Sequence, residues 1–326
     1  GALVHIINHA LFKGLLFLGA GSVLHAAGTV QLDRLGGLLK RMPNSAGLFL
    51  IAAAAICGLP PLNGFLGEFL VFLGALRGVL GSDLSTGVMG AAVIGGLGLI
   101  SGLAVACFTR AFGLTFLGEP RSNETNHAHE AAWPMLLPMA LLAAACLAVG
   151  LACPWFLGSL LPETLRVTCP AAIGAAARLD DLLAPLQGVV TVVALLLALI
   201  ATLTLVRRVL LRGRPIGEAG TWDCGYLRPT ARMEYTASSF AQPLVALFRT
   251  VLRTRRSATA ITDEFPRGAK LETQTGDLFA DRLIDPAFRR VREALSRLRW
   301  IQHGQVRLYV LYIALTLLAL LIWKLT

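Results

Sequence analysis

Residues 5–25 read HIINHALFKGLLFLGAGSVLH, an apolar stretch that contains ionisable side chains. About 20 predominantly apolar residues are enough for an α-helix to cross the hydrocarbon core of a bilayer. His5, His9 and Lys13 follow one another at intervals of four residues, which places them on one helix face at steps of about 6 Å. We therefore expect a membrane-spanning helix with an ionisable face.

The composition of the whole chain is that of a membrane protein. Of its 326 residues, 56% are hydrophobic and 15% are charged, and the mean hydropathy is +0.68. Soluble domains are closer to a quarter charged. Further apolar stretches cover about residues 86–117, 133–151, 185–206 and 306–323, whereas residues 158–184 resemble a mixed loop. The pattern predicts an all-α, polytopic transmembrane helical bundle, with about five to six spans in residues 1–211 and a final span in residues 305–326.

A second decisive stretch covers residues 58–70 and reads GLPPLNGFLGEFL. Proline removes a backbone donor and clashes with the preceding turn, so residues 58–64 cannot form a regular helix. We expect residues 45–80 to form either a helix interrupted within the membrane or a span followed by a re-entrant half. Irregular backbone at membrane depth occurs where it lines a cavity or an ion site.

Ionisable groups inside membrane spans are costly, so His5, His9, Lys13 and Glu68 are candidates for a proton pathway. A histidine titrates near neutral pH and can both accept and donate a proton. Glu68 directly follows the break. Surroundings of low dielectric there would disfavour its charged form, so that the carboxyl group can alternate between its neutral and charged forms. His25 is either the exit of this pathway or an ordinary interfacial residue. The alternatives are a snorkelling lysine with two core histidines, and a glutamate that caps the second half-helix.

The net charge of +10 is concentrated between residues 207 and 304, which hold 18 Lys and Arg against 10 Asp and Glu. The positive-inside rule assigns such a region to the cytoplasmic surface. Nucleic acid is not expected as a partner, because spans precede and follow the region. Apolar residues at intervals of three and four predict an amphipathic surface helix before the last span; they are Ile284, Phe288, Val291, Leu295 and Leu298. The alternative is a helix packed on a small soluble subdomain.

The six cysteines form no Cys-x-x-Cys pair, and several lie in apolar segments, where cysteine behaves as a small hydrophobe. We therefore expect no metal site, no bound cofactor and no catalytic residue in this chain. The chain opens with Gly1, and its first residues already resemble the middle of a helix. This predicts a fragment or a trimmed chain.

The two quoted stretches resemble the antiporter-like membrane subunits of complex I and its relatives, a family shared with Mrp-type cation/proton antiporters. The first is similar to the family's helix with two histidines and a lysine, and the second to its second discontinuous helix. The resemblance implies that His5, His9 and Lys13 belong to a central hydrophilic axis. It also implies that Glu68 fills the key position at the broken helix, where some members have lysine, and that only the second half-channel is present.

Residues 221–244, TWDCGYLRPTARMEYTASSFAQPL, are similar to the large membrane subunit of formate hydrogenlyase and hydrogenase-4-type complexes. The resemblance implies a non-catalytic, proton-translocating subunit of the cell inner membrane. Its partners would be the other membrane and peripheral subunits of a hydrogenase, formate hydrogenlyase or NADH–quinone oxidoreductase type of complex. NiFe and iron–sulfur centres would belong to those partners.

Two other functions stay open, a Na⁺/proton antiporter module and a structural membrane anchor for a peripheral oxidoreductase. Whichever of these functions is correct, we expect the chain to consist of three parts. Residues 1–211 form the antiporter-like half-channel, residues 212–304 a basic surface or lateral-helix region, and residues 305–326 the final span.

Overall fold

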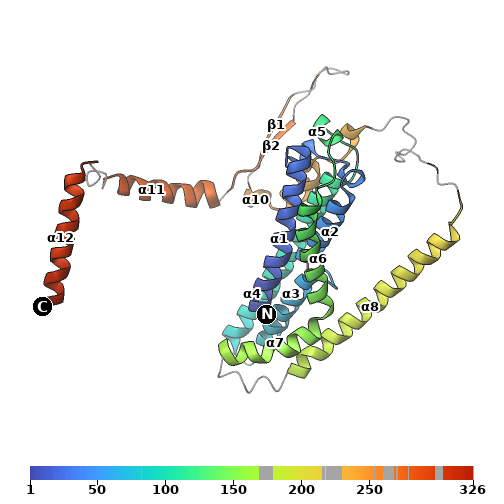
Figure 1. Ribbon diagram of the computed structural model, residues 1–326, viewed down its shortest axis with the longest axis horizontal. Helices are drawn as coiled ribbons and strands as arrows, with labels where there is room; N and C mark the ends of the chain where they lie inside the picture. The colour runs from blue at the N-terminus through green and yellow to red at the C-terminus, as the bar shows by residue number, and fades with distance from the viewer. Residues whose placement is uncertain are drawn as a thin grey trace. The chain divides into compact units, whose positions relative to one another are not determined.

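The chain is built almost entirely from helices, as seen in a computed structural model (Figure 1). The structure describes residues 1–81, 83–168, 179–214, 217, 230–252, 254–259, 268, 271–277, 279–297 and 304–325. Five helices in these ranges are long and apolar enough to cross a membrane. They are α1 (Ala2–Ala27), α4 (Leu84–Phe116), α6 (Trp133–Leu151), α8 (Leu179–Leu210) and α12 (Val306–Leu325). The all-α, polytopic membrane fold is thus confirmed.

The broken helix consists of α2 (Pro43–Ile56) and α3 (Asn63–Val79). Pro60 and Pro61 have no N–H, and Gly58 has a φ of 65°, so the chain turns where the helix would otherwise continue. α2 and α3 each pack on α1, α4 and α6. Both halves therefore belong to one bundle, which favours an interrupted helix over a re-entrant half.

Buried apolar side chains form three groups along this bundle. The first joins α1, α2, α4 and α6 near the end of α1, and its aromatic members Phe49 and Phe116 have ring centroids 5.4 Å apart. The second lies at the helix break and comprises Phe12, Ala55, Leu62 and Cys146. The third lies beside the first turns of α3 and comprises Leu66, Cys153, Leu157 and Leu186. Most of the surface of α4 is apolar and open, as expected of a helix that faces lipid or other helices.

The mixed loop expected for residues 158–184 is partly wrong. α7 (Cys153–Thr168) is a helix, and α8 already begins at Leu179; residues 169–178 lie outside the described ranges. α7 is amphipathic. Leu157 packs against Leu66 and Leu186, whereas Glu163 and Arg166 form an exposed ion pair one turn apart. The exposed charges of this ion pair made the composition of residues 158–184 resemble that of a loop.

The start of α4 is fixed by a side-chain cap. The carboxylate of Asp83 accepts a hydrogen bond from the Thr86 N–H at 2.9 Å, and the hydroxyls of Thr86 and Ser85 donate to the same oxygen. These hydrogen bonds, with that of the Thr86 side chain as the largest cause, lower the pKa of Asp83 to about 2. The cap is therefore ionised at every physiological pH.

The remaining elements are short. The turns are η1 (Leu32–Arg34), η2 (Leu38–Lys40), η4 (Ala231–Met233) and the π-helical η5 (Ala280–Ile284). The helices are α5 (Asn123–Asn126), α9 (Ala237–Leu247), α10 (Arg249–Leu252) and α11 (Asp285–Ser296). The strands β1 (Arg255–Ala258) and β2 (Leu271–Gln274) pair antiparallel, with Arg255 opposite Gln274.

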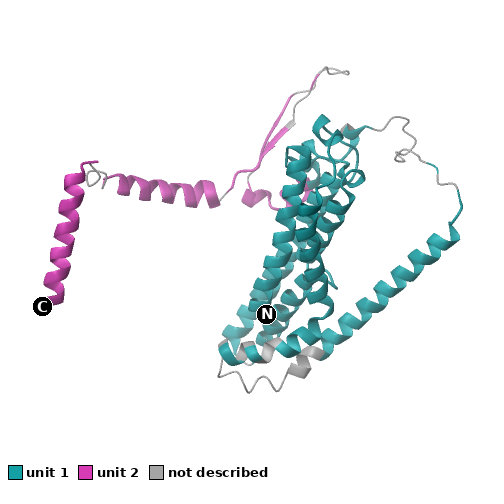
Figure 2. Ribbon diagram, viewed as in Figure 1, with its two compact units in different colours: residues 1–240 teal, residues 241–326 magenta. Residues whose placement is uncertain are grey.

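Two compact units are distinguished, residues 1–240 and residues 241–326 (Figure 2). Within the second unit, η5 and α11 form the amphipathic helix expected from the spacing of Phe288, Val291 and Leu295, while Leu298 lies outside the described residues. The functional division at residue 211 stays a prediction.

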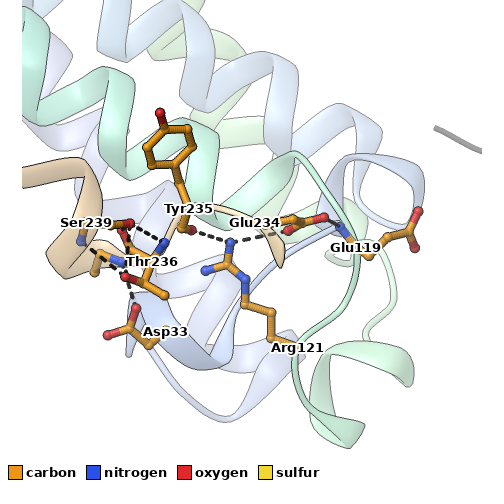
Figure 3. Close-up of polar contacts among 8 residues, drawn as sticks. Asp33, Glu119, Arg121, Glu234, Tyr235, Thr236 and Ser239 are labelled. Atoms are coloured by element: carbon orange, nitrogen blue, oxygen red, sulfur yellow. Dashed lines mark hydrogen bonds and ion pairs between the residues drawn. The ribbon is translucent and has the colours of Figure 1, made fainter. Parts of the chain in front are cut away.

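Residues 231–240 dock on the end of the bundle where α4 ends (Figure 3). The carboxylate of Glu234 accepts hydrogen bonds from the Glu119 N–H at 2.8 Å and from the Arg121 guanidinium at 3.3 Å. The same nitrogen of Arg121 donates to the Tyr235 carbonyl at 2.7 Å. The Ala237 N–H donates to Asp33 at 2.7 Å. Residues 231–240, which belong to the 221–244 motif and to the first unit, therefore form a docking segment.

We predict that Gly150→Ala destabilises the protein. A methyl group at Gly150 of α6 would overlap the carbonyl oxygen of Pro61 in the helix break. Such overpacking costs about 1–3 kcal/mol. Thermal unfolding of the purified protein in detergent measures the effect. Gly21→Ala is the control, because nothing lies near a Cβ at Gly21, and an unfolding temperature of Gly150→Ala equal to that of Gly21→Ala contradicts the prediction.

Candidate functional site

The ionisable face of α1 forms as the spacing predicted. The ring centroids of His5 and His9 are 6.0 Å apart, and both rings meet the buried ring of Phe12 edge-on, at 6.4 and 5.4 Å. Two rings at that separation do not hydrogen-bond directly, so a proton would pass between them through a bridging water. Phe12 thereby holds the two imidazoles in a fixed relation to each other.

Lys13 extends the same face by one turn. Its Nζ lies 5.7 Å from the centroid of the Phe17 ring, within the range of a cation–π interaction. No ion pair joins Lys13 to Glu68 in the described part of the chain. Lys13 is half-buried on this face of α1.

His5 connects α1 to the helix that carries the glutamate. A Cβ at Gly67 of α3 would lie 2.9 Å from Nδ1 and 3.0 Å from Cα of His5, so only a glycine allows this approach. Glu68 is the next residue along α3. The close packing at Gly67 therefore brings the histidine face of α1 to the turn of α3 that bears the carboxyl group.

Glu68 is half-buried between the break and α4. Its Oε2 accepts a hydrogen bond from the Ser101 hydroxyl at 3.0 Å, and a Cβ at Gly58 would lie 2.7 Å from the same oxygen. The first turn of α3 has no side-chain cap, so Glu68 does not serve as one. Sequence reasoning missed Ser101, because a single serine in an apolar helix carries no signal of its partner.

Two asparagines fasten the break to α1. The Asn8 side-chain amide donates to the Asn63 carbonyl at 2.8 Å. The Asn63 amide donates in turn to the backbone and side-chain oxygens of Asn8, each at 3.3 Å. Both side chains are fully buried. The exchange provides partners for the Asn63 carbonyl and for both side-chain amides, whereas Asn63 Oδ1 has none in the described part of the chain. It fixes the position of the break beside His5 and His9.

His25 is not brought to the other candidates. It is exposed in the last turn of α1, about 30 Å along the helix from His5 at about 1.5 Å per residue. Its role at the exit of a pathway stays a prediction, as do the roles of the other four residues in proton transfer.

Comparison with known proteins finds one family model and several relatives that point to the same family. The family model of the NADH:quinone oxidoreductase/Mrp antiporter transmembrane region matches residues 1–94. Hydrogenase-4 component B of Escherichia coli is 32% identical over 99% of this chain and 49% of its own length. Formate hydrogenlyase subunit 3 of the same organism is 33% identical over 78% of this chain and 40% of its own. The chain thus spans about half the length or less of these curated relatives.

A solved structure has the same fold. It is a chain of the membrane-bound sulfane sulfur reductase, an archaeal respiratory membrane complex. The alignment has a TM-score of 0.57 at 22% identity and covers 98% of this chain and 47% of the reductase chain. The expected family resemblance, including its hydrogenase-4 and formate hydrogenlyase branch, is confirmed by these comparisons.

We predict that Asn8→Leu destabilises the bundle. The substitution removes the side-chain donor to the buried Asn63 carbonyl and one of the two acceptors of the Asn63 amide, so that only the backbone carbonyl of residue 8 remains for that amide. Loss of such partners for buried polar groups costs about 1–3 kcal/mol. The matched control is Asn44→Leu, since the Asn44 side chain is exposed at the start of α2. Thermal unfolding in detergent compares the two variants, and equal unfolding temperatures would count against a structural role for the pair.

Proposed function

We propose that the chain forms part of a proton-translocating subunit of a redox-driven membrane complex, because residues 1–94 match the family model of the NADH:quinone oxidoreductase/Mrp antiporter transmembrane region. The subunit is a multi-pass protein of the cell inner membrane. It carries no redox chemistry itself, and the electron-transferring centres belong to partner subunits of a hydrogenase or formate hydrogenlyase type of complex.

The observation that carries the proposal is the continuity of ionisable groups across three helices. Lys13, His9 and His5 follow one face of α1, and His5 packs at Gly67, beside Glu68 on α3. Ser101 of α4 completes the series through its hydrogen bond to Glu68. A chain of groups that can each accept and release a proton, placed beside an interrupted helix, suits proton transfer rather than anchoring.

Transfer along this series would be driven by electrostatics. Electron transfer in a partner subunit changes the charge near one end and shifts the balance between the protonated and deprotonated forms of each group. Lys13 releases its proton to His9, the proton passes by water to His5, and Glu68 accepts it in the low-dielectric surroundings of the break. Ser101 donates a hydrogen bond to the ionised carboxylate and releases it when Glu68 is protonated.

We predict that Glu68→Gln and Lys13→Ala each abolish pumping but not electron transfer. Both variants remove a proton-carrying group, whereas the redox centres lie in other subunits. The measurement is proton uptake per electron with the full-length subunit in its intact complex, in sealed membranes. Glu163→Gln is the matched control, because the Glu163 side chain is 67% exposed in α7, away from this series.

Other results would favour the other two functions. Variants that pump like the wild type, in a complex that assembles and transfers electrons, would make the chain a membrane anchor. Proton movement that depends on Na⁺ and proceeds without electron transfer would instead favour a cation/proton antiporter module.

We predict a smaller effect for Ser101→Ala. A hydrogen bond to a charged group is worth about 1.5–3 kcal/mol, so loss of this donor should slow proton transfer through Glu68 by about tenfold, since 1.4 kcal/mol corresponds to that factor. Ser101→Thr keeps the hydroxyl and should stay near the wild-type rate. Ser159→Ala is the control, because Ser159 bonds only its own helix backbone. Equal rates for Ser101→Ala and Ser101→Thr would contradict the role of the hydroxyl.

A further inference from the structure

A cavity of about 320 Å³ opens where the docking segment 231–240 meets the end of α4. Its walls combine two guanidinium groups, Arg110 and Arg121, with apolar and aromatic side chains; the latter include Leu114, Leu117, Tyr235 and Phe240. The whole cavity lies within the first compact unit. None of these residues belongs to the proposed proton series, whose member on α4 is Ser101.

The two arginines of this cavity are incompletely paired. The side chain of Arg121 is only 10% exposed, yet its Nε and Nη1 have no hydrogen-bond partner. Nε of Arg110 is also buried without a partner, and in the described ranges Arg110 makes no ion pair. Buried N–H groups are nearly always satisfied in folded proteins, and an unsatisfied one costs about 1–3 kcal/mol. The arrangement therefore calls for an acceptor that the described chain does not supply.

The charges around the cavity leave a positive surplus. Glu234 is the one carboxylate among the described lining residues, and it binds Arg121 through Nη2 only, beside the Tyr235 carbonyl (Figure 3). Arg110 has no counter-charge there. An anion with several oxygen acceptors, such as a phosphate, would neutralise Arg110 and supply the acceptors that the arginine N–H groups lack.

We propose that this cavity binds an anionic phospholipid, with its phosphate at Arg110 and Arg121 and its acyl chains on the apolar surface of α4. Arg110 lies about 9 Å before the end of α4, at about 1.5 Å per residue, so its side chain reaches the level of lipid headgroups by extending toward the interface. Leu114, Leu117 and Phe240 offer contacts that a free, fully hydrated anion would not use.

The size of the cavity agrees with a headgroup. Pockets for whole small ligands measure roughly 300–1,000 Å³, so 320 Å³ accommodates a phosphate with its glycerol and leaves the acyl chains in the bilayer. The lipid would link α4 to the segment 231–240, because Arg121 contacts that segment through Glu234 and Tyr235. Such binding would stabilise the docking of the segment independently of proton transfer.

The experiment uses the full-length subunit in its intact complex, reconstituted in vesicles of phosphatidylcholine alone or of equal parts phosphatidylcholine and phosphatidylglycerol. Native mass spectrometry after extraction counts the retained lipids. The wild type should retain phosphatidylglycerol, and Arg110→Gln should retain about tenfold less, since a charged hydrogen bond is worth about 1.5–3 kcal/mol. Arg110→Lys should restore part of the retention.

The matched control is Arg77→Gln, which removes the same charge from an exposed position in the last turn of α3; it should retain phosphatidylglycerol like the wild type. Arg110 is preferred over Arg121 as the test position, because removing Arg121 would also release Glu234. Equal retention by Arg110→Gln and the wild type would overturn the proposal. So would equal retention of phosphatidylcholine and phosphatidylglycerol, or displacement of the lipid by inorganic phosphate.

Discussion

The hydrogen bonds between Asn8 and Asn63 are the contact on which the arrangement of the candidate site depends. Backbone N–H and C=O groups at membrane depth cannot form hydrogen bonds with water. A helix that breaks there therefore needs hydrogen-bond partners from neighbouring helices. Asn8 supplies one for the first residue of α3, and Asn63 returns the bond. Because Asn8 lies between His5 and His9 on α1, the pair that secures the break also sets the histidines at its level.

Glycines make the same region compact. At Gly64, Gly67 and Gly150, a Cβ would meet the Ala55 carbonyl, His5 and the Pro61 carbonyl, respectively. Three helices thus approach the break more closely than side chains would allow. This close packing therefore fixes the position of His5 relative to α3, the helix that carries Glu68.

The sequence predicted the features that depend on local chemistry. The spacing of His5, His9 and Lys13 predicted that they share one helix face, and Pro60 and Pro61 predicted the helix break. Both features could be predicted because each depends only on residues close together in the chain. Ser101 and the contacts of Glu234 were missed, because they join residues far apart in the chain and no local pattern encodes such pairings. α7 was mistaken for a loop, because its amphipathic face is interrupted by an exposed ion pair.

Polar groups on α4 fall into two sets with different surroundings. Ser101 faces Glu68 and belongs to the interior of the bundle. Arg110 comes about two and a half turns later, at 3.6 residues per turn, and lines the cavity shared with the docking segment. An arginine so near the end of a span is long enough to extend its guanidinium toward the interface and away from Glu68. The spacing along α4 therefore separates the hydroxyl that binds Glu68 from the guanidinium that lines the cavity near the end of the helix.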